Sequence, residues 1–184
     1  RLIETMGRLS RLAERLLALA RAEGAEPLVH EWVDLDRVVR LTVEELRHDA
    51  RLRERTLTAD VTPVRVRADL DAVGLALRNL VENALVHGAG GRWIRVSCRR
   101  EQRGIVVAVT DDGPGVASKD LPTLAQRFKR AGNTAGDGAG LGLAIVAMLA
   151  RRMHARLGLK SPPQGLTAGF EARLTWPASG EPTA

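Results

Sequence analysis

The chain has 184 residues, of which 45% are hydrophobic and 27% charged, the balance of a soluble globular protein with one core. Its composition excludes an internal disulfide, because Cys98 is the single cysteine, and no apolar run reaches the roughly 18 residues that a membrane span needs. The net charge of +6 does not predict a nucleic-acid partner, because the arginines are scattered and only 3% of residues are aromatic. A start at Arg1 rather than Met leads us to expect a fragment of a longer protein. The single cysteine fits a reducing compartment, and we expect the fragment to be cytoplasmic.

Residues 1–22 are predicted to form one helix that Gly24 ends and Pro27 prevents from continuing. Its leucines follow the alternating spacing of three and four residues that is typical of a coiled-coil or helix-bundle seam. A helix of this length is too short to be stable alone, which favours a partner helix. An amphipathic helix packed on its own domain is the alternative. The seam residues are Leu2, Leu9, Leu12, Leu16 and Leu19.

A compact domain is predicted from residue 28. Asp34 is a good N-cap for a helix over 35–50, and strands are expected at 56–60 and 64–68, joined around Pro63. Asp69 is the expected N-cap of a second helix that runs to His87. Its predicted core stripe comprises Leu70, Val73, Leu77, Leu80, Val81 and Ala84.

Strands are expected at 92–99 and 104–110, the second buried on both faces because it is almost wholly apolar. Residues 116–139 have weak periodicity and the length of a functional lid. A helix over 140–153 and strands at 155–160 and 169–175 follow, before a loose polar tail from Pro177. This order predicts an α+β fold, a two-layer sandwich of a mixed sheet with helices on one face.

Two amides lie one helical turn apart in the string Asn79-Leu80-Val81-Glu82-Asn83. They fall off the predicted core stripe and so face a groove. A neutral amide oxygen suits Mg²⁺, which takes oxygen ligands and keeps several waters. Two surface asparagines on a helix are the alternative, although asparagine is a poor helix former.

The string Asp111-Asp112-Gly113-Pro114-Gly115 places a carboxylate directly after a buried strand. An ionised carboxylate accepts hydrogen bonds only, so it suits the exocyclic amine of adenine and would repel a guanine carbonyl. Gly113 or Gly115 can take a positive φ in the turn that follows. An ordinary turn that begins with aspartate is the alternative.

The string Gly138-Ala139-Gly140-Leu141-Gly142-Leu143 precedes a predicted helix, where backbone amides and the helix dipole favour an anion such as phosphate. It matches neither the dinucleotide-binding fingerprint nor a Walker loop, because the last glycine of the first and the Gly-Lys-Ser/Thr of the second are missing. The segment before it carries cations that could approach phosphates: Lys119, Arg127, Lys129 and Arg130.

In this order and spacing, the three strings resemble the ATP-binding catalytic domain of bacterial sensor histidine kinases, of the Bergerat ATP-fold superfamily. The resemblance covers roughly residues 28–176. Arg127-Phe128-Lys129-Arg130 is similar to the phenylalanine-bearing lid motif of that family, and residues 8–24 resemble the second helix of its dimerisation and histidine-phosphotransfer domain.

The resemblance implies that the cofactors are ATP and Mg²⁺, with Asn83 as the metal ligand and Asn79 assisting at the phosphates. Asp111 would bind the adenine amine beside Gly113 and Gly115. The residues expected around the triphosphate are Gly138, Gly140, Leu141, Gly142 and Leu143, with Arg130 and Arg127 approaching the γ-phosphate. The reaction implied is phosphoryl transfer to a histidine, then relay to the receiver domain of a response regulator. The parent protein would be a homodimer anchored in a membrane outside this fragment.

Two departures from the family pattern matter. Val86 occupies a position where many members carry lysine or arginine, and the phosphoacceptor motif is missing, so we expect no autophosphorylation by this fragment. His30-Glu31 and His48-Asp49 are not followed by the Arg-Thr-Pro pattern and are interpreted as solvated histidines. His154 is expected to interact with a helix carboxyl end.

Two other functions stay open at this point. One is an ATP-hydrolysing relative of the gyrase or chaperone type, which carries a glutamate general base where this chain has Asn79. The other is a degenerate kinase domain that acts only as an interaction module.

Overall fold

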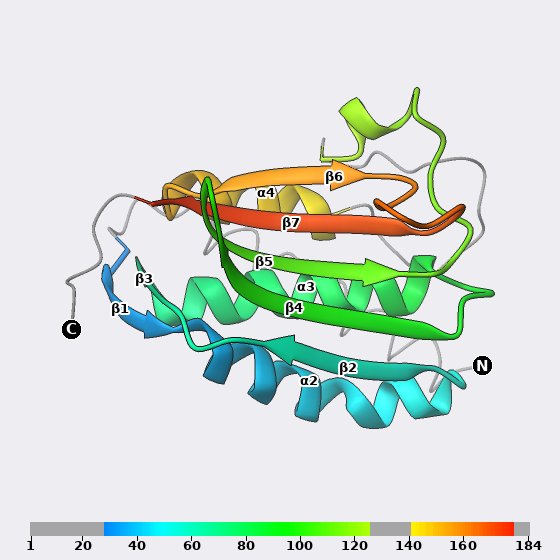
Figure 1. Ribbon diagram of the computed structural model, residues 1–184, viewed down its shortest axis with the longest axis horizontal. Helices are drawn as coiled ribbons and strands as arrows, with labels where there is room; N and C mark the ends of the chain where they lie inside the picture. Colours follow the sequence, from blue (N-terminus) through cyan, green and yellow to red (C-terminus); the bar gives the residue numbers. More distant parts are fainter. Residues whose placement is uncertain (1–27, 126–140, 179–184) are drawn as a thin grey trace, which may run out of the picture.

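A computed structural model describes residues 28–125 and 141–178 of the chain (Figure 1). The predicted helix over 1–22, residues 126–139 of the predicted lid and residues 179–184 of the predicted tail lie outside the described residues. The boundaries proposed for the amino-terminal helix and the tail therefore stay predictions.

One layer of the fold is a five-stranded sheet in the order β2-β4-β5-β7-β6. The pair β2–β4 is parallel and the other neighbours are antiparallel, which confirms the mixed sheet. The strands are β2 (Thr56–Val61), β4 (Trp93–Glu101), β5 (Gly104–Asp111), β6 (Arg156–Lys160) and β7 (Phe170–Pro177). The prediction for β5 is confirmed, since all residues from Gly104 to Val109 are buried.

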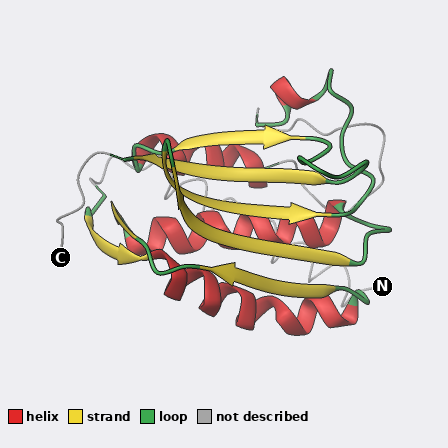
Figure 2. Ribbon diagram, viewed as in Figure 1, coloured by secondary structure: helices red, strands yellow, loops and turns green. Residues whose placement is uncertain are grey.

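The second layer consists of three helices on one face of that sheet (Figures 1 and 2). These are α2 (Leu35–Leu52), α3 (Leu70–His87) and α4 (Gly142–Arg152). A short 3₁₀ helix, Leu121–Thr123, lies in the first part of the predicted lid. The two-layer α+β sandwich is therefore confirmed for the described residues.

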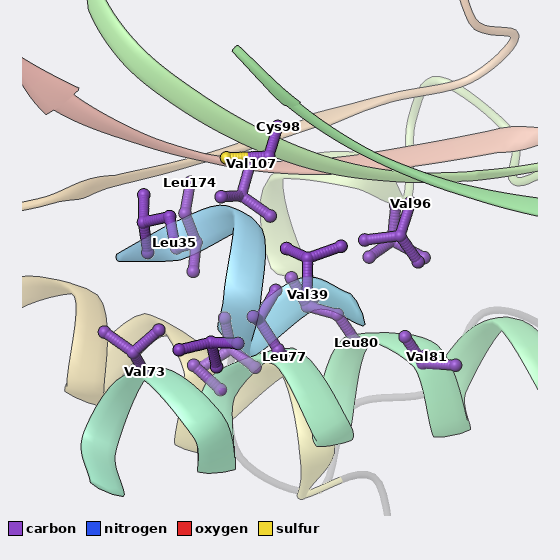
Figure 3. Packing of buried hydrophobic residues seen from close by; sticks show 14 of the residues in the cluster. Leu35, Val39, Val73, Leu77, Leu80, Val81, Val96, Cys98, Val107 and Leu174 are labelled. Atoms are coloured by element: carbon purple, nitrogen blue, oxygen red, sulfur yellow. The ribbon is translucent and has the colours of Figure 1, made fainter. Parts of the chain in front are cut away.

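The core lies between the two layers and is built from aliphatic side chains (Figure 3). Leu77 and Leu80 of α3 and Val39 of α2 point toward Val107 of the sheet. Cys98 is fully buried among them, and burial, with a smaller effect of Asp36, raises the pKa of its thiol to about 12. This thiol packs as a small apolar group and is not a nucleophile at neutral pH.

The two predicted N-caps behave differently. Asp69 accepts a hydrogen bond from the backbone N–H of Ala72 at 2.9 Å, so its capping role is confirmed. Asp34 does precede α2, but within the described residues its carboxylate makes no capping hydrogen bond. It forms an ion pair with Arg65, the first residue of strand β3 (Arg65–Ala68), at 2.9 Å instead, and this long-range partner competes with the local cap.

The predicted core stripe of α3 is wrong at one position, because the Leu70 side chain is 48% exposed. Leu70 is the first residue of the helix, and helical side chains lean toward the amino end, so this one extends past the packed layer. The sequence also did not predict β1 (Glu31–Asp34), which pairs with β3 (Arg65–Ala68) in a separate two-stranded sheet. Four residues are too few to show an alternating pattern.

Candidate nucleotide site

The predicted strings meet at the carboxyl end of α3. Asp111 is the last residue of β5, Gly142 is the first residue of α4, and both contact the last turns of α3 or the residues that follow it. β5 is the central strand of the sheet and packs over α3 (Figure 1). This arrangement brings the end of β5 close to the end of α3 and to the start of α4.

Asp111 is a buried carboxylate with a local partner. It is 3% exposed, and its Oδ1 accepts a hydrogen bond from the backbone N–H of Gly113 at 2.9 Å. Burial raises the pKa of Asp111, and the Gly113 N–H and the nearby Arg55 guanidinium offset part of that rise. A buried acceptor-only group next to a turn has the chemistry expected for contact with an amine.

The turn after Asp111 packs against the end of α3 without space for side chains. A Cβ added to Gly113 would lie 2.5 Å from the Cα of Gly88, the residue that follows α3. Further along, Gly115 has a φ of +73°, so the predicted positive φ occurs at Gly115. These glycines allow the turn to approach the helix end and keep Asp111 close to it.

Asp112 has a different environment from its neighbour. Its Oδ1 accepts backbone hydrogen bonds from Arg92 at 2.8 Å and Trp93 at 2.9 Å, at the start of β4. The Asp112 carboxylate therefore joins the turn after β5 to the start of β4 and has a structural role.

The two amides of α3 also differ. Asn79 is 6% exposed, and its Nδ2 donates to the carbonyl of Leu75 at 2.8 Å, which leaves its Oδ1 for another group. Asn83 is half-buried, and its buried Nδ2 has no hydrogen-bond partner among the described residues. Because nitrogen and oxygen of an amide are distinguished only by their partners, this end of Asn83 is the group available to a ligand.

The amino end of α4 touches Asn83. A Cβ on Gly142 would lie 2.7 Å from Oδ1 of Asn83, so only glycine allows this helix start to approach the amide. Leu141, at the N-cap position, offers no side-chain acceptor, so within the described residues the first N–H groups of α4 have no side-chain cap. Its own side chain is fully buried in the core, so only its backbone could contact a ligand.

The donor set fits a magnesium ion that is held mainly by phosphates. The described residues contain no group of three or more His, Cys, Asp or Glu side chains that could hold a metal. Among the described residues, the buried Nδ2 of Asn83 lacks a hydrogen-bond partner beside a helix start. With the amide turned over, an oxygen at that position would match the preference of Mg²⁺ for one or two protein oxygens plus substrate phosphates and water.

Several predicted site residues lie outside the described residues: Arg127, Lys129, Arg130, Gly138 and Gly140. The histidines set aside in the sequence lie away from the site. His48 is exposed on α2, and the rings of His30 and His154 are 5.6 Å apart, near the first residues of β5 rather than its last.

Sequence reasoning missed Arg55, which is 8% exposed and lies beside the carboxyl end of α3. Its Nη1 donates to the carbonyl oxygen of Ala84 at 2.8 Å. The sequence did indicate that Arg55 is buried. Arg55 lies two residues before Leu57 at the start of a strand, so the two side chains share the inner face of that strand. The two nearby arginines at positions 51 and 53 obscured this indication, because the run resembles a solvated basic segment.

The fold and this arrangement define an ATP-binding α+β domain. The chain belongs to the family of histidine kinase-, DNA gyrase B- and HSP90-like ATPases, whose model matches residues 68–179. Within that family its relatives are sensor histidine kinases, and the described residues form a catalytic domain of their kind.

Two curated relatives illustrate the similarity. The sensor-like histidine kinase SenX3 of Mycolicibacterium smegmatis is 35% identical over 161 residues, which cover 85% of this chain and 42% of the relative. The sensor protein QseC of Escherichia coli O157:H7 is 29% identical over 173 residues, 92% of this chain and 37% of QseC. The chain thus spans less than half the length of these relatives.

Solved structures agree with the fold. The mycobacterial sensor histidine kinase MprB has a TM-score of 0.70 at 27% identity, over 81% of this chain and 97% of that one. Full-length ShkA in complex with AMPPNP has a TM-score of 0.79 at 26% identity, over 97% of this chain and 38% of ShkA. Among the described helices of the present chain, none has both the length and the apolar character to cross a membrane.

Proposed function

We propose that this chain binds Mg²⁺-ATP at the carboxyl end of α3 and transfers the γ-phosphoryl group to a histidine that is absent from residues 1–184. The observation that carries the proposal is the meeting of Asn83 with the start of α4 at Gly142. It joins an amide that suits a metal to backbone N–H groups that suit phosphates.

Each ligand group has a proposed partner in the site. Asp111 accepts a hydrogen bond from the adenine amine, Asn83 holds Mg²⁺, and Asn79 assists at the phosphates through the remaining N–H of its Nδ2. When bound, the ion neutralises phosphate charge and orients the transferred group. Arg127 and Arg130 are proposed to approach the γ-phosphate, and the backbone of Gly138, Gly140, Leu141, Gly142 and Leu143 to surround the triphosphate. Catalysis then consists of positioning and charge neutralisation.

Transfer to histidine is favoured over hydrolysis by the chemistry of Asn79. Its Nδ2 already donates to Leu75, and an amide cannot take a proton from water as a carboxylate can. A bound water in this site would therefore lack a general base at that position, which favours an incoming nucleophile that needs none.

The partners follow from the proposed reaction. The phosphoacceptor is a helix of the parent kinase, for which residues 1–24 supply the second helix of a dimeric bundle, and the phosphoryl group passes to a response-regulator receiver domain. We place the catalytic part in the cytoplasm and the membrane anchor of the parent elsewhere in that protein.

A comparison of two chains tests this function. With γ-labelled Mg²⁺-ATP, the present chain is expected to bind nucleotide but to release little phosphate and label itself negligibly. A longer chain of the same protein that includes the residues encoded before Arg1 is expected to acquire an acid-labile, base-stable phosphohistidine.

Three results would contradict the proposal in different ways. Rapid phosphate release by the present chain would indicate an ATP-hydrolysing relative. A failure to bind nucleotide would indicate an interaction module. Phosphate mapped to His30 or His48 would show that the acceptor lies in this chain.

A further inference from the structure

Arg55 is a buried cation that the proposed reaction does not use directly. It follows α2, precedes β2 and is 8% exposed. Burying an arginine is costly unless its N–H groups are satisfied, and here Nη1 donates to the carbonyl of Ala84 at 2.8 Å. Ala84 is the residue after Asn83, so the guanidinium binds α3 next to the proposed metal ligand.

The backbone around Arg55 is fixed by the way α2 ends. The N–H of Arg55 donates to the carbonyl of Ala50 at 2.9 Å, and that of Glu54 donates to Arg51 at 2.9 Å. With Glu54 at a φ of +56°, these two bonds form a Schellman motif. On the other side, the N–H of Thr56 donates to Arg92 at 2.9 Å. The side chain therefore starts from a defined position.

Arg55 and Asp111 approach each other across Gly88. A Cβ placed on Gly88 would lie 3.0 Å from Nη1 of Arg55 and 3.0 Å from Oδ1 of Asp111, so the two atoms are at most twice that distance apart. No side chain separates them at that point, because the intervening residue is glycine.

The charges act on each other in the expected sense. Burial lowers the pKa of Arg55, and Asp111 offsets part of that effect. Burial raises the pKa of Asp111, which the Gly113 N–H and then Arg55 oppose, while Asp112 acts in the same direction as burial. The guanidinium thus favours the ionised carboxylate, the form that accepts from an amine without donating.

We propose that Arg55 is a positioning residue for adenine recognition, which binds the last turn of α3 and stabilises Asp111 as an acceptor for the exocyclic amine. This inference rests on the proposed binding of ATP. Through one side chain, Arg55 connects the helix that carries Asn83 to the end of β5.

The test is the ratio of affinities for ATP and inosine triphosphate, measured by calorimetry with Mg²⁺ in excess. Inosine carries a carbonyl oxygen in place of the amine, so the ratio reports the contact with Asp111 and is insensitive to phosphate binding. Asp111→Ala sets the ratio expected without that contact. Arg53→Met is the matched control, because Arg53 is exposed and only two residues away.

Arg55→Met is expected to lower the ratio by about tenfold, mainly through weaker ATP binding, whereas Arg53→Met leaves it unchanged. Arg55→Lys, which keeps the charge, should restore part of the ratio and serves alone if Arg55→Met does not fold. In the Asp111→Ala background, Arg55→Met should not change the ratio further.

An equal loss of affinity for ATP and inosine triphosphate in Arg55→Met or Arg55→Lys, with the ratio intact, would overturn the inference. Arg55 would then have a structural role only. Wild-type protein that binds neither nucleotide would overturn the proposed function itself, and the inference with it. The two failures are therefore distinguishable.

Discussion

Asp111 and Asp112 are adjacent and chemically identical, yet the fold uses them differently. Asp111 is buried, and its Oδ1 accepts a hydrogen bond from the backbone N–H of Gly113 in its own turn. Asp112 accepts from two backbone N–H groups of the neighbouring strand. We propose that the first carboxylate binds a ligand, whereas the second joins the β5 turn to the start of β4.

The difference shows that the turn after β5 is held in place by residues other than Asp111. The Asp112 contacts fix the turn from the side of β4, and the contact of Gly113 with Gly88 fixes it from the side of α3. The turn can then hold Asp111 in a buried position, where ionisation of its carboxylate costs stability, as the raised pKa indicates.

Asp111→Ala is expected to have the largest effect, which is a loss of affinity for ATP. Removal of the acceptor should weaken ATP binding by roughly 1.5–3 kcal/mol, the value of a charge-assisted hydrogen bond. Calorimetry measures this change. Unchanged affinity would refute the role of Asp111 in binding adenine.

Asp112→Ala is expected to have the opposite profile. Two N–H groups at the start of β4 lose their acceptor, so the free energy of unfolding should fall by about 1–2 kcal/mol in urea titration. Asp112→Asn, which keeps an acceptor oxygen, is the control and should recover much of this loss. A larger effect on ATP binding than on stability would remove the distinction between the two aspartates.

The smallest expected effect is a gain in stability by Asp111→Asn without nucleotide. The pKa of Asp111 is raised in the folded protein, so ionisation destabilises the fold as pH rises from the ordinary carboxyl range through the raised value. The amide avoids that penalty and should unfold at higher urea concentration at neutral pH. The gain should disappear when the pH is below the ordinary range, and its persistence there would exclude this cause.

The sequence predicted most elements of this fold because their periods are strong. The alternation in β7 and the nearly continuous apolar run in β5 each extend over enough residues to be recognised in the sequence. Asp69 marks the start of α3. The separate sheet of β1 and β3 was not predictable, since pairing between distant short strands leaves no local signal.

The candidate site was predicted in part for the same reason. Asn83, Asp111 and Gly142 belong to strings with fixed spacing, and each lies near the carboxyl end of α3. Arg55 was missed because its importance depends on the contact with Ala84, 29 positions away in the sequence. The exposure of Leu70 likewise depends on where the packed layer ends.

The most direct test of the account is a calorimetric titration of the wild-type chain with ATP and with GTP, both with Mg²⁺. An ionised Asp111 accepts from the adenine amine and repels the guanine carbonyl, so ATP is expected to bind at least about tenfold more tightly than GTP. Equal affinities for the two nucleotides would contradict the assignment of this carboxylate to the base.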